Sequence, residues 1–339
     1  MSINNSVILK SSKYKKKDQW WFKLLRPEIA TIILFILVFF VNVNLSPYFA
    51  DIGFILDFSS IYIEFGIIAI SMTFIIITGN IDLSVTSIMA LVGCATGLMY
   101  KAGINMYVSI TLGLLLGILL GFLNGLFIVK LKLPSIIVTI GTMALYRGIA
   151  QILLGDHSVG KFPEWFVGID RYFIGIIPVP LCIFSILVIM FGFILNYTVF
   201  GRNVYAIGTN NVCALYSCVP GDSIVMGLFC LSGFLSAIGG LFMISRLGVA
   251  RFDMAFGGEL DIITIVLLGG VSINGGKGNI FGPVIAFFLL LIIRVGMSVA
   301  NIKIESQLVV IGSLLIISVI ITNLVNNIHS RCSRKKFIK

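Results

Sequence analysis

Long apolar runs, separated by short polar stretches, recur along nearly the whole chain. The runs lie at residues 29–46, 60–78, 85–100, 107–129, 134–154, 177–197, 222–245, 259–273, 280–299 and 307–325. A run of about 20 apolar residues has the length of a membrane-spanning helix. A helix also pairs its backbone amides within its own segment, as lipid requires. The pattern therefore predicts an all-α integral membrane protein with about ten transmembrane helices.

Composition agrees with this prediction, and charge adds an orientation. The 339 residues are 58% hydrophobic and 11% charged, whereas a soluble domain has about 25% charged residues. Half of the 24 basic residues lie in two tails. They are Lys10, Lys13, Lys15, Lys16, Lys17, Lys23, Arg26, Arg331, Arg334, Lys335, Lys336 and Lys339. Because basic segments beside membrane spans favour the cytoplasm and anionic lipid, we expect cytoplasmic tails at 1–27 and 327–339 around a polytopic domain at 28–326.

A polar break, TGNIDLSVTS at residues 78–87, interrupts two apolar runs and brings Asp82 close to hydrocarbon. An intramembrane carboxylate is costly and usually functional. Gly79 can end the preceding helix, and Asn80 or Asp82 can cap the next. A helix N-terminus inside a membrane protein offers N–H donors to a polar solute such as a sugar. The alternative is that Asp82 only caps a helix near the cytoplasmic edge, where the predicted topology places it.

Glycines form two further patterns. A second polar, glycine-containing break at 269–279 parallels the first. Paired breaks point to a transporter built from two related halves, and chance placement is the alternative. One run also carries a glycine at every fourth position, which gives Gly113, Gly117, Gly121 and Gly125. This row lies on one helix face, where it predicts tight helix packing or, alternatively, a moving interface.

Recognisable enzyme motifs are absent from the sequence. It contains no GxxxxGK[ST] loop, no HExxH, no GxSxG and no CxxC pair. The chain is therefore not expected to hydrolyse ATP itself, and we expect no enzyme activity, cofactor or metal. No soluble domain is left to present a basic surface, so we expect no nucleic-acid partner.

Several charged residues within or beside the runs need partners. Arg147 lies well inside its segment, and a buried arginine needs a carboxylate or several carbonyls. Asp82 and Glu64 are the carboxylates that we consider. Glu259 begins another segment, where a carboxylate commonly complements the helix dipole. Asp253 and Glu259 are alternatively placed to contact an external partner.

The longest predicted cytoplasmic loop, residues 198–221, contains a short helix candidate at Asn211–Ser217 between Gly208 and Pro220. A short helix on the cytoplasmic face can fit a groove in a soluble partner. The alternative is a linker that lies at the membrane interface.

Four segments together resemble one family. TGNIDLSVTS resembles GGIDLSVGS, and residues 134–150 resemble P-x-I-V-T-L-G-T-x-x-I-Y-R-G-I-A. Residues 201–220 resemble the loop G-R-x-x-x-A-x-G-x-N-x-x-A-A-x-x-x-G-I, and residues 257–286 a pattern beginning G-x-E-L-D. From residue 28 onward the chain resembles the permease subunit of ATP-binding-cassette sugar importers, in the ribose, xylose, rhamnose and autoinducer-2 group.

The resemblance implies a ten-helix permease that dimerises, pairs with two ATPase subunits and receives solute from an extracytoplasmic binding protein. With the patterns above, it gives three groups of site residues. The solute pathway or its bracing is expected at Asn80, Asp82, Ser84, Ser87, Asn124, Thr142 and Arg147. The ATPase-coupling loop is expected to use Arg202, Gly208, Asn210, Asn211, Ala214, Leu215 and Cys218. Contact with the binding protein is expected at Asp253 and Glu259.

The chain departs from the family patterns in both central motifs. Asn80 and Thr86 replace glycines of the break, which we expect to alter it. In the docking loop, Cys213 replaces an alanine and Cys218 a glycine, which we expect to make its fit to an ATPase specific to its partner.

The resulting hypothesis is a bacterial plasma-membrane permease subunit that imports a sugar or sugar-like solute, energised by a separate ATPase. Membrane lipids and a second permease subunit, identical or not, are the other expected partners. The alternatives are an ion-coupled secondary transporter, which needs a membrane carboxylate that changes protonation, and a membrane-bound scaffold or enzyme.

Overall fold

The computed structural model describes residues 27–46, 49, 51–169 and 172–337, and it is built almost entirely from helices. The helices are α2 Pro27–Leu45, α3 Ile52–Ile77, α4 Val85–Lys101, α5 Met106–Lys130, α6 Ser135–Leu154, α7 Glu164–Val167, α8 Val179–Tyr197, α9 Val199–Thr209, α10 Asn211–Tyr216, α11 Gly221–Leu247, α12 Gly258–Leu268, α13 Phe281–Val299 and α14 Ile304–Phe337. The strands are two residues long: β1 Val159–Gly160, β2 Phe173–Ile174, β3 Ile177–Pro178 and β4 Val249–Ala250, with β1 antiparallel to β4 and β2 to β3.

Each of the ten predicted segments coincides with a helix, which confirms the all-α membrane fold. Within the described residues, six helices are long and apolar enough to cross a membrane: α3, α5, α6, α8, α11 and α13. Shorter apolar helical stretches occur in α2, α4 and α14, and α12 has 11 residues. The predicted tail at 1–27 lies outside the described residues except for Pro27, whereas the predicted tail at 327–339 continues α14 as far as Phe337.

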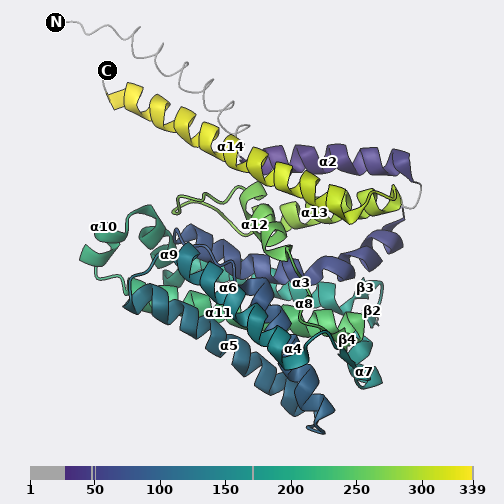
Figure 1. Ribbon diagram of the computed structural model, residues 1–339. Helices are drawn as coiled ribbons and strands as arrows, with labels where there is room; N and C mark the ends of the chain where they lie inside the picture. Colours follow the sequence, from purple (N-terminus) through teal and green to yellow (C-terminus); the bar gives the residue numbers. More distant parts are fainter. Residues whose placement is uncertain (1–26, 47–48, 50, 170–171, 338–339) are drawn as a thin grey trace, which may run out of the picture.

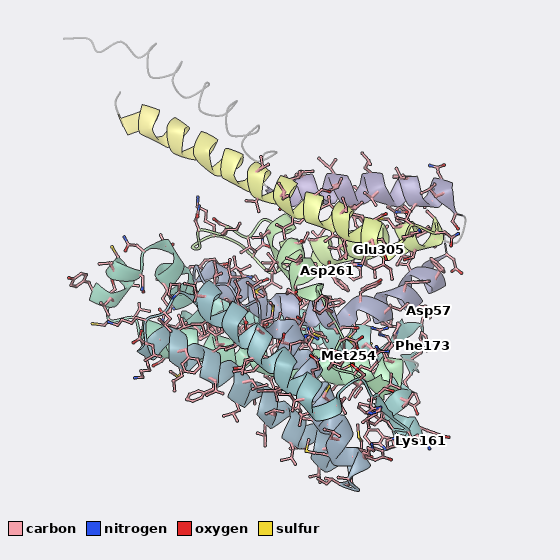
Figure 2. All side chains as sticks on the ribbon, in the orientation of Figure 1. Asp57, Lys161, Phe173, Met254, Asp261 and Glu305 are labelled. Carbon is pink, nitrogen blue, oxygen red and sulfur yellow. The ribbon has the colours of Figure 1, made fainter. Side chains whose placement is uncertain are left out.

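The helices lie between two distinct ends of the molecule (Figure 1). One end carries α9 and α10, and the opposite end carries α7 and the short strands; we call them the α10 end and the α7 end. α11 packs against α5, α3 and α4, while α2, α12, α13 and α14 form a layer beside α3. Met254 and Asp261 lie between the two ends, and Lys161 lies at the α7 end (Figure 2).

The glycine row of α5 permits close contact with α11. A Cβ atom at Gly117 would lie 2.5 Å from the Ala237 Cβ, and one at Gly121 would lie 2.2 Å from the Phe229 carbonyl oxygen. Any larger side chain would separate the two helices. The structure therefore confirms tight packing as the role of this row.

The two polar breaks end their helices with the same geometry. The amides of Gly79 and Asn80 bond back to carbonyls of α3 at 2.9 and 3.1 Å, and Gly79 has φ +83°. The amides of Gly270 and Val271 do the same on α12, at 3.0 and 3.3 Å, with φ +88° at Gly270. This paired pattern is the Schellman motif, which favours glycine at the left-handed position. The parallel between the breaks is thus also structural.

The two breaks meet each other beside α9. The amide of Gly276 donates to the carbonyl of Ile77 at 2.8 Å, directly before the first break. A Cβ atom at Gly208, on α9, would lie 1.8 Å from that same carbonyl oxygen. The end of α3, the 269–279 loop and α9 therefore form one close junction near the α10 end.

Candidate functional site

Asp82 is fully buried and is held by hydroxyl groups. Its Oδ1 accepts hydrogen bonds from the Ser84 amide at 3.0 Å and the Ser84 hydroxyl at 2.7 Å. Its Oδ2 accepts one from Ser232 of α11 at 2.8 Å. The carboxylate thus ties the break to α11. The cap predicted from Asn80 or Asp82 takes a different form, because Ser84 is the N-cap of α4 and Asp82 fixes that residue.

The network continues through two further helices. The amide of Asn124, on α5, donates to the Ser84 hydroxyl at 2.8 Å. The Tyr146 hydroxyl, on α6, has two acceptors within hydrogen-bond distance, the Leu120 carbonyl at 3.0 Å and the Asn124 side-chain oxygen at 3.2 Å. Polar groups at this depth need such partners. We call Asp82, Ser84, Asn124, Tyr146 and Ser232 the buried polar centre.

The buried polar centre lies deeper than the sequence indicated. Ser232 and Tyr146 each lie 11 residues after the start of their helices, Gly221 and Ser135, which is about 16 Å along the axis. Asp82, which Ser232 contacts, therefore lies beside the middle part of α11, whereas the predicted topology placed it near the cytoplasmic edge. The segment before α4 re-enters the bundle, where hydroxyl and amide groups replace water.

The remaining pathway candidates differ in their surroundings. Asn80 is half-buried and donates to the Thr78 hydroxyl at 3.0 Å. Thr142 is buried, and its hydroxyl lies 3.4 Å from the Thr139 carbonyl of its own helix. Ser87 is fully buried, and among the described residues its hydroxyl has no hydrogen-bond partner. None of the three joins the buried polar centre through a contact described for it.

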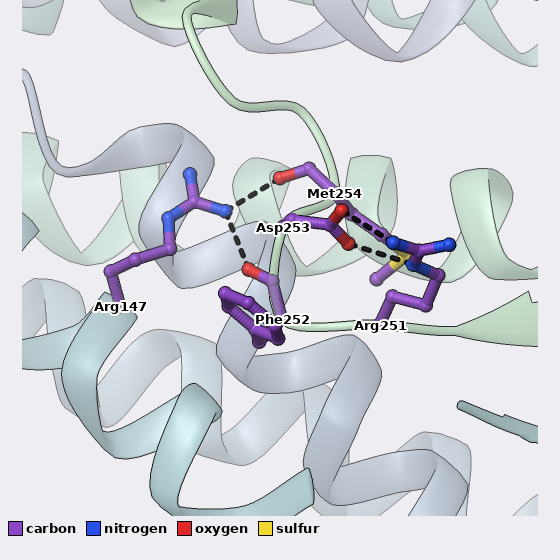
Figure 3. A network of polar contacts seen from close by, with 5 residues as sticks. All are labelled: Arg147, Arg251, Phe252, Asp253 and Met254. Atoms are coloured by element: carbon purple, nitrogen blue, oxygen red, sulfur yellow. Dashed lines mark hydrogen bonds and ion pairs between the residues drawn. The ribbon is translucent and has the colours of Figure 1, made fainter. Parts of the chain in front are cut away.

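Arg147 reaches from α6 to the loop that precedes α12 (Figure 3). It donates to the carbonyls of Phe252 at 2.8 Å and Met254 at 2.6 Å. It also donates to the Thr86 hydroxyl at 3.3 Å, and Thr86 donates to the Glu259 carboxylate at 2.8 Å. The expectation of carbonyl partners for Arg147 is confirmed, and the pairing with Asp82 or Glu64 is wrong.

The two residues expected to contact a binding protein occupy different environments. Asp253 accepts two hydrogen bonds from Arg251, at 2.7 and 2.9 Å, and its side chain is 43% exposed. These bonds and the nearby carboxylate charge raise the pKa of the Arg251 guanidinium above its ordinary value. Glu259 is half-buried and turned towards Thr86. Asp253 is thus the more available of the two.

Two further ion pairs join helices in the interior. Arg246 of α11 lies 2.5 Å from Glu64 of α3, and Arg294 of α13 lies 2.5 Å from Asp261 of α12. Glu64 was considered from the sequence as a partner of Arg147, and neither of these two pairings was predicted. Each arginine lies more than 30 residues from its carboxylate along the chain, so local sequence carries no signal for the pairing.

The predicted short helix is present as α10, from Asn211 to Tyr216. Asn210 caps it, because its side-chain oxygen accepts from the amides of Val212 and Cys213 at 3.0 and 3.1 Å. Ala214 lies on the buried face of α10, whereas Leu215 is 71% exposed.

The exposed face of α10 is largely apolar. Val212, Leu215 and Tyr216 form it, and Tyr216 is 85% exposed. Arg202 and Asn211 are also exposed. Cys218, which follows the helix, has φ +58°, a left-handed conformation that favours glycine, the residue of the family pattern at this place.

Comparisons with known proteins agree that the chain is similar to transport permeases. A family model described as "Branched-chain amino acid transport system / permease component" matches residues 54–319. The chain is similar to the autoinducer 2 import system permease protein LsrD of Escherichia coli K12, with 33% identity over 86% of this chain and 91% of the relative. LsrD of Shigella flexneri gives the same values. LsrD of Escherichia coli O157:H7 is 33% identical over 86% of this chain and 90% of its own length. No solved structure matches.

Proposed function

This chain belongs to the permease family described as "Branched-chain amino acid transport system / permease component", and on that premise we propose that it is the membrane subunit of an ATP-binding-cassette importer. It is a multi-pass protein of the bacterial cell membrane. The proposed cargo is a sugar or sugar-like polar solute, carried inward and energised by a separate ATPase. The named relatives, permeases of autoinducer 2 import systems, make autoinducer 2 the first solute to test, and the family resemblance adds ribose and rhamnose.

The proposed topology has ten membrane segments with both tails in the cytoplasm. The ten helices at the predicted segments support it, with α4 and α12 as short segments that start inside the bundle. α14 ends towards the same side as α9 and α10 (Figure 1), as this orientation requires. The α10 end then faces the cytoplasm, and the α7 end faces outward.

The observation that carries the coupling proposal is the exposed apolar face of α10. A short helix with its apolar side uncovered fits a hydrophobic groove on a soluble partner. We assign this partner as the ATPase. Gly208, on the neighbouring α9, touches the carbonyl of Ile77, so a pull on the loop reaches the start of the break and the 269–279 loop directly. Rigid movements of this kind can switch the bundle between outward and inward openings.

The surroundings of Asp82 favour bracing over solute contact. Each of its oxygens already accepts hydrogen bonds, and Asp82, Ser84 and Asn124 are fully buried. The rival, an ion-coupled transporter, needs a carboxylate that exchanges protons with water during transport. The closed network around Asp82 supports the ATP-driven mechanism instead.

The α7 end supplies the proposed contact for the binding protein. A cleft of about 670 Å³ lies there, and Lys101 and Lys161 are among its lining residues. Asp253, which pairs with Arg251, lies three residues after β4 of that end, and its side chain is 43% exposed. The proposed contact with a second permease subunit is a different surface, on α6. There Gly141 and Gly148 leave room for a neighbouring backbone to approach.

Co-purification of the chain with its ATPase tests the coupling proposal. Leu215→Asp and Tyr216→Asp place charge on the apolar face, so we expect each to abolish association while insertion and monodispersity stay normal. The control is Asp222→Asn, an exposed position at the start of α11 that lies outside this face. If both charged variants retain a stoichiometric ATPase, α10 is not the docking element. Ala214 is unsuitable for this test because it is buried.

A further inference from the structure

Thr86 is the one residue that bridges Arg147 and Glu259 among the described contacts. Its hydroxyl is fully buried, donates to Glu259 at 2.8 Å and accepts from Arg147 at 3.3 Å. A hydroxyl has one hydrogen to donate and lone pairs to accept with, so it can bind an anion and a cation at once. The glycine of the family pattern at this position has no side chain for such a bridge.

Arg147 in turn holds the segment that leads into α12. We call residues 251–257 the strap. Arg147 grips its backbone at two carbonyls, and Figure 3 shows Asp253 turned away towards Arg251. Met254 is buried by insertion against α4: a Cβ atom at Gly93 would lie 2.7 Å from the Met254 methyl carbon. The strap therefore covers the face of α4 at Gly93, on the same helix as Thr86.

The strap has the features of a segment that can be released. It lies outside regular helices and strands, and its last residue, Gly257, has φ +81° next to the first residue of α12. Phe256 is 81% exposed, with the Arg147 guanidinium 5.7 Å from its ring centroid. The Arg147 bonds to its carbonyls and the buried Met254 side chain thus hold the strap, and these contacts can break without disrupting a helix.

We propose that Thr86 is a positioning residue of the transport cycle, whose hydroxyl locks Arg147 and Glu259 together and so keeps the strap closed over the α7-facing side of the buried polar centre. Breaking the bridge frees Arg147 and opens the strap. The role in transport rests on the proposed function, whereas the closure of the strap is a property of this chain alone.

Hydrogen–deuterium exchange of the purified full-length protein tests the inference. Thr86→Val keeps the shape of the side chain and removes the hydroxyl. We expect it to raise amide exchange in the strap by about tenfold, which corresponds to about 1.4 kcal/mol. Thr86→Ser should restore the wild-type rate. The matched control is Thr96→Val on the same helix, because the Thr96 hydroxyl is buried and has no hydrogen-bond partner among the described residues.

Two results would overturn the inference. One is unchanged strap exchange in a folded Thr86→Val protein. The other is an equal rise along the whole chain, which would show a purely structural role. If Thr86→Val does not fold, Arg147→Met at the half-buried end of the bridge should open the strap equally, and wild-type exchange in that variant would count against the lock.

A second readout separates this inference from the proposed function. In a complex with the ATPase, Thr86→Val should raise ATP hydrolysis in the absence of binding protein, while Thr96→Val should not. If no ATPase associates with the wild-type chain, the proposed function fails and strap exchange alone decides the inference. If the complex forms and Thr86→Val leaves hydrolysis unchanged, the strap is not part of the transport cycle.

Discussion

Replacing Asp82 with alanine should sharply destabilise the protein. The carboxylate accepts three hydrogen bonds, from the Ser84 amide at 3.0 Å, the Ser84 hydroxyl at 2.7 Å and the Ser232 hydroxyl at 2.8 Å. Asp82 is fully buried, so its three donors would lose their acceptor away from bulk water. A stranded buried donor costs about 1–3 kcal/mol. Three of them lower the free energy of unfolding by at least about 3 kcal/mol.

A graded series separates this effect from the loss of charge. Asp82→Asn keeps one carbonyl oxygen for Ser84, and the Ser232 hydroxyl can rotate to accept from the new amide. The expected loss is therefore about 1 kcal/mol. Asp57→Ala is the matched control, because Asp57 is exposed on α3. It should change stability by less than about 0.5 kcal/mol.

Unfolding in mixed micelles of rising sodium dodecyl sulfate fraction, followed by circular dichroism, measures the series. The expected order of stability is wild type and Asp57→Ala, then Asp82→Asn, then Asp82→Ala. If Asp82→Ala unfolds at the same detergent fraction as the control, the buried polar centre contributes no stability and the bracing role is refuted.

Three further changes are measured by the same unfolding assay. Gly208→Ala should cost more than about 3 kcal/mol because its Cβ would overlap a backbone oxygen, whereas Gly227→Ala has open space and should be neutral or slightly stabilising; equal effects would contradict the junction. Cys218→Gly should stabilise by about 0.5–1 kcal/mol by relieving φ +58°, and a loss would contradict the strain. Arg294→Met strands the Asp261 carboxylate and should cost about 3–5 kcal/mol; adding Asp261→Leu should recover most of it, and no recovery would contradict the pairing.

The apolar pattern was sufficient to locate the helices, because a long apolar run in a membrane has to pair its backbone amides within its own segment. It failed at depth. Asp82 and its neighbours read as a polar stretch near the membrane edge, but hydropathy does not distinguish a polar group facing water from one satisfied by Ser232 inside the bundle. That partner lies 150 residues away along the chain, so only the fold reveals it.

Local motifs were most informative where the chemistry is local. Gly79 ends α3 as predicted, and Asn210 and Asn211 begin α10, because caps depend on residues a few positions apart. The partners of Arg147 were not predictable: the carbonyls it grips belong to residues 105 and 107 positions later. Thr86 was marked as unusual by comparison with the family pattern, and its bridging contacts give that departure a physical meaning.

Solute uptake into proteoliposomes tests the central claim most directly. Vesicles should contain the chain with its ATPase, receive the binding protein outside, and be offered labelled autoinducer 2, ribose and rhamnose in turn. The account predicts accumulation of one of these that requires ATP inside and persists when a proton ionophore is added. Accumulation by the chain alone, driven by a proton gradient and abolished by the ionophore, would contradict it.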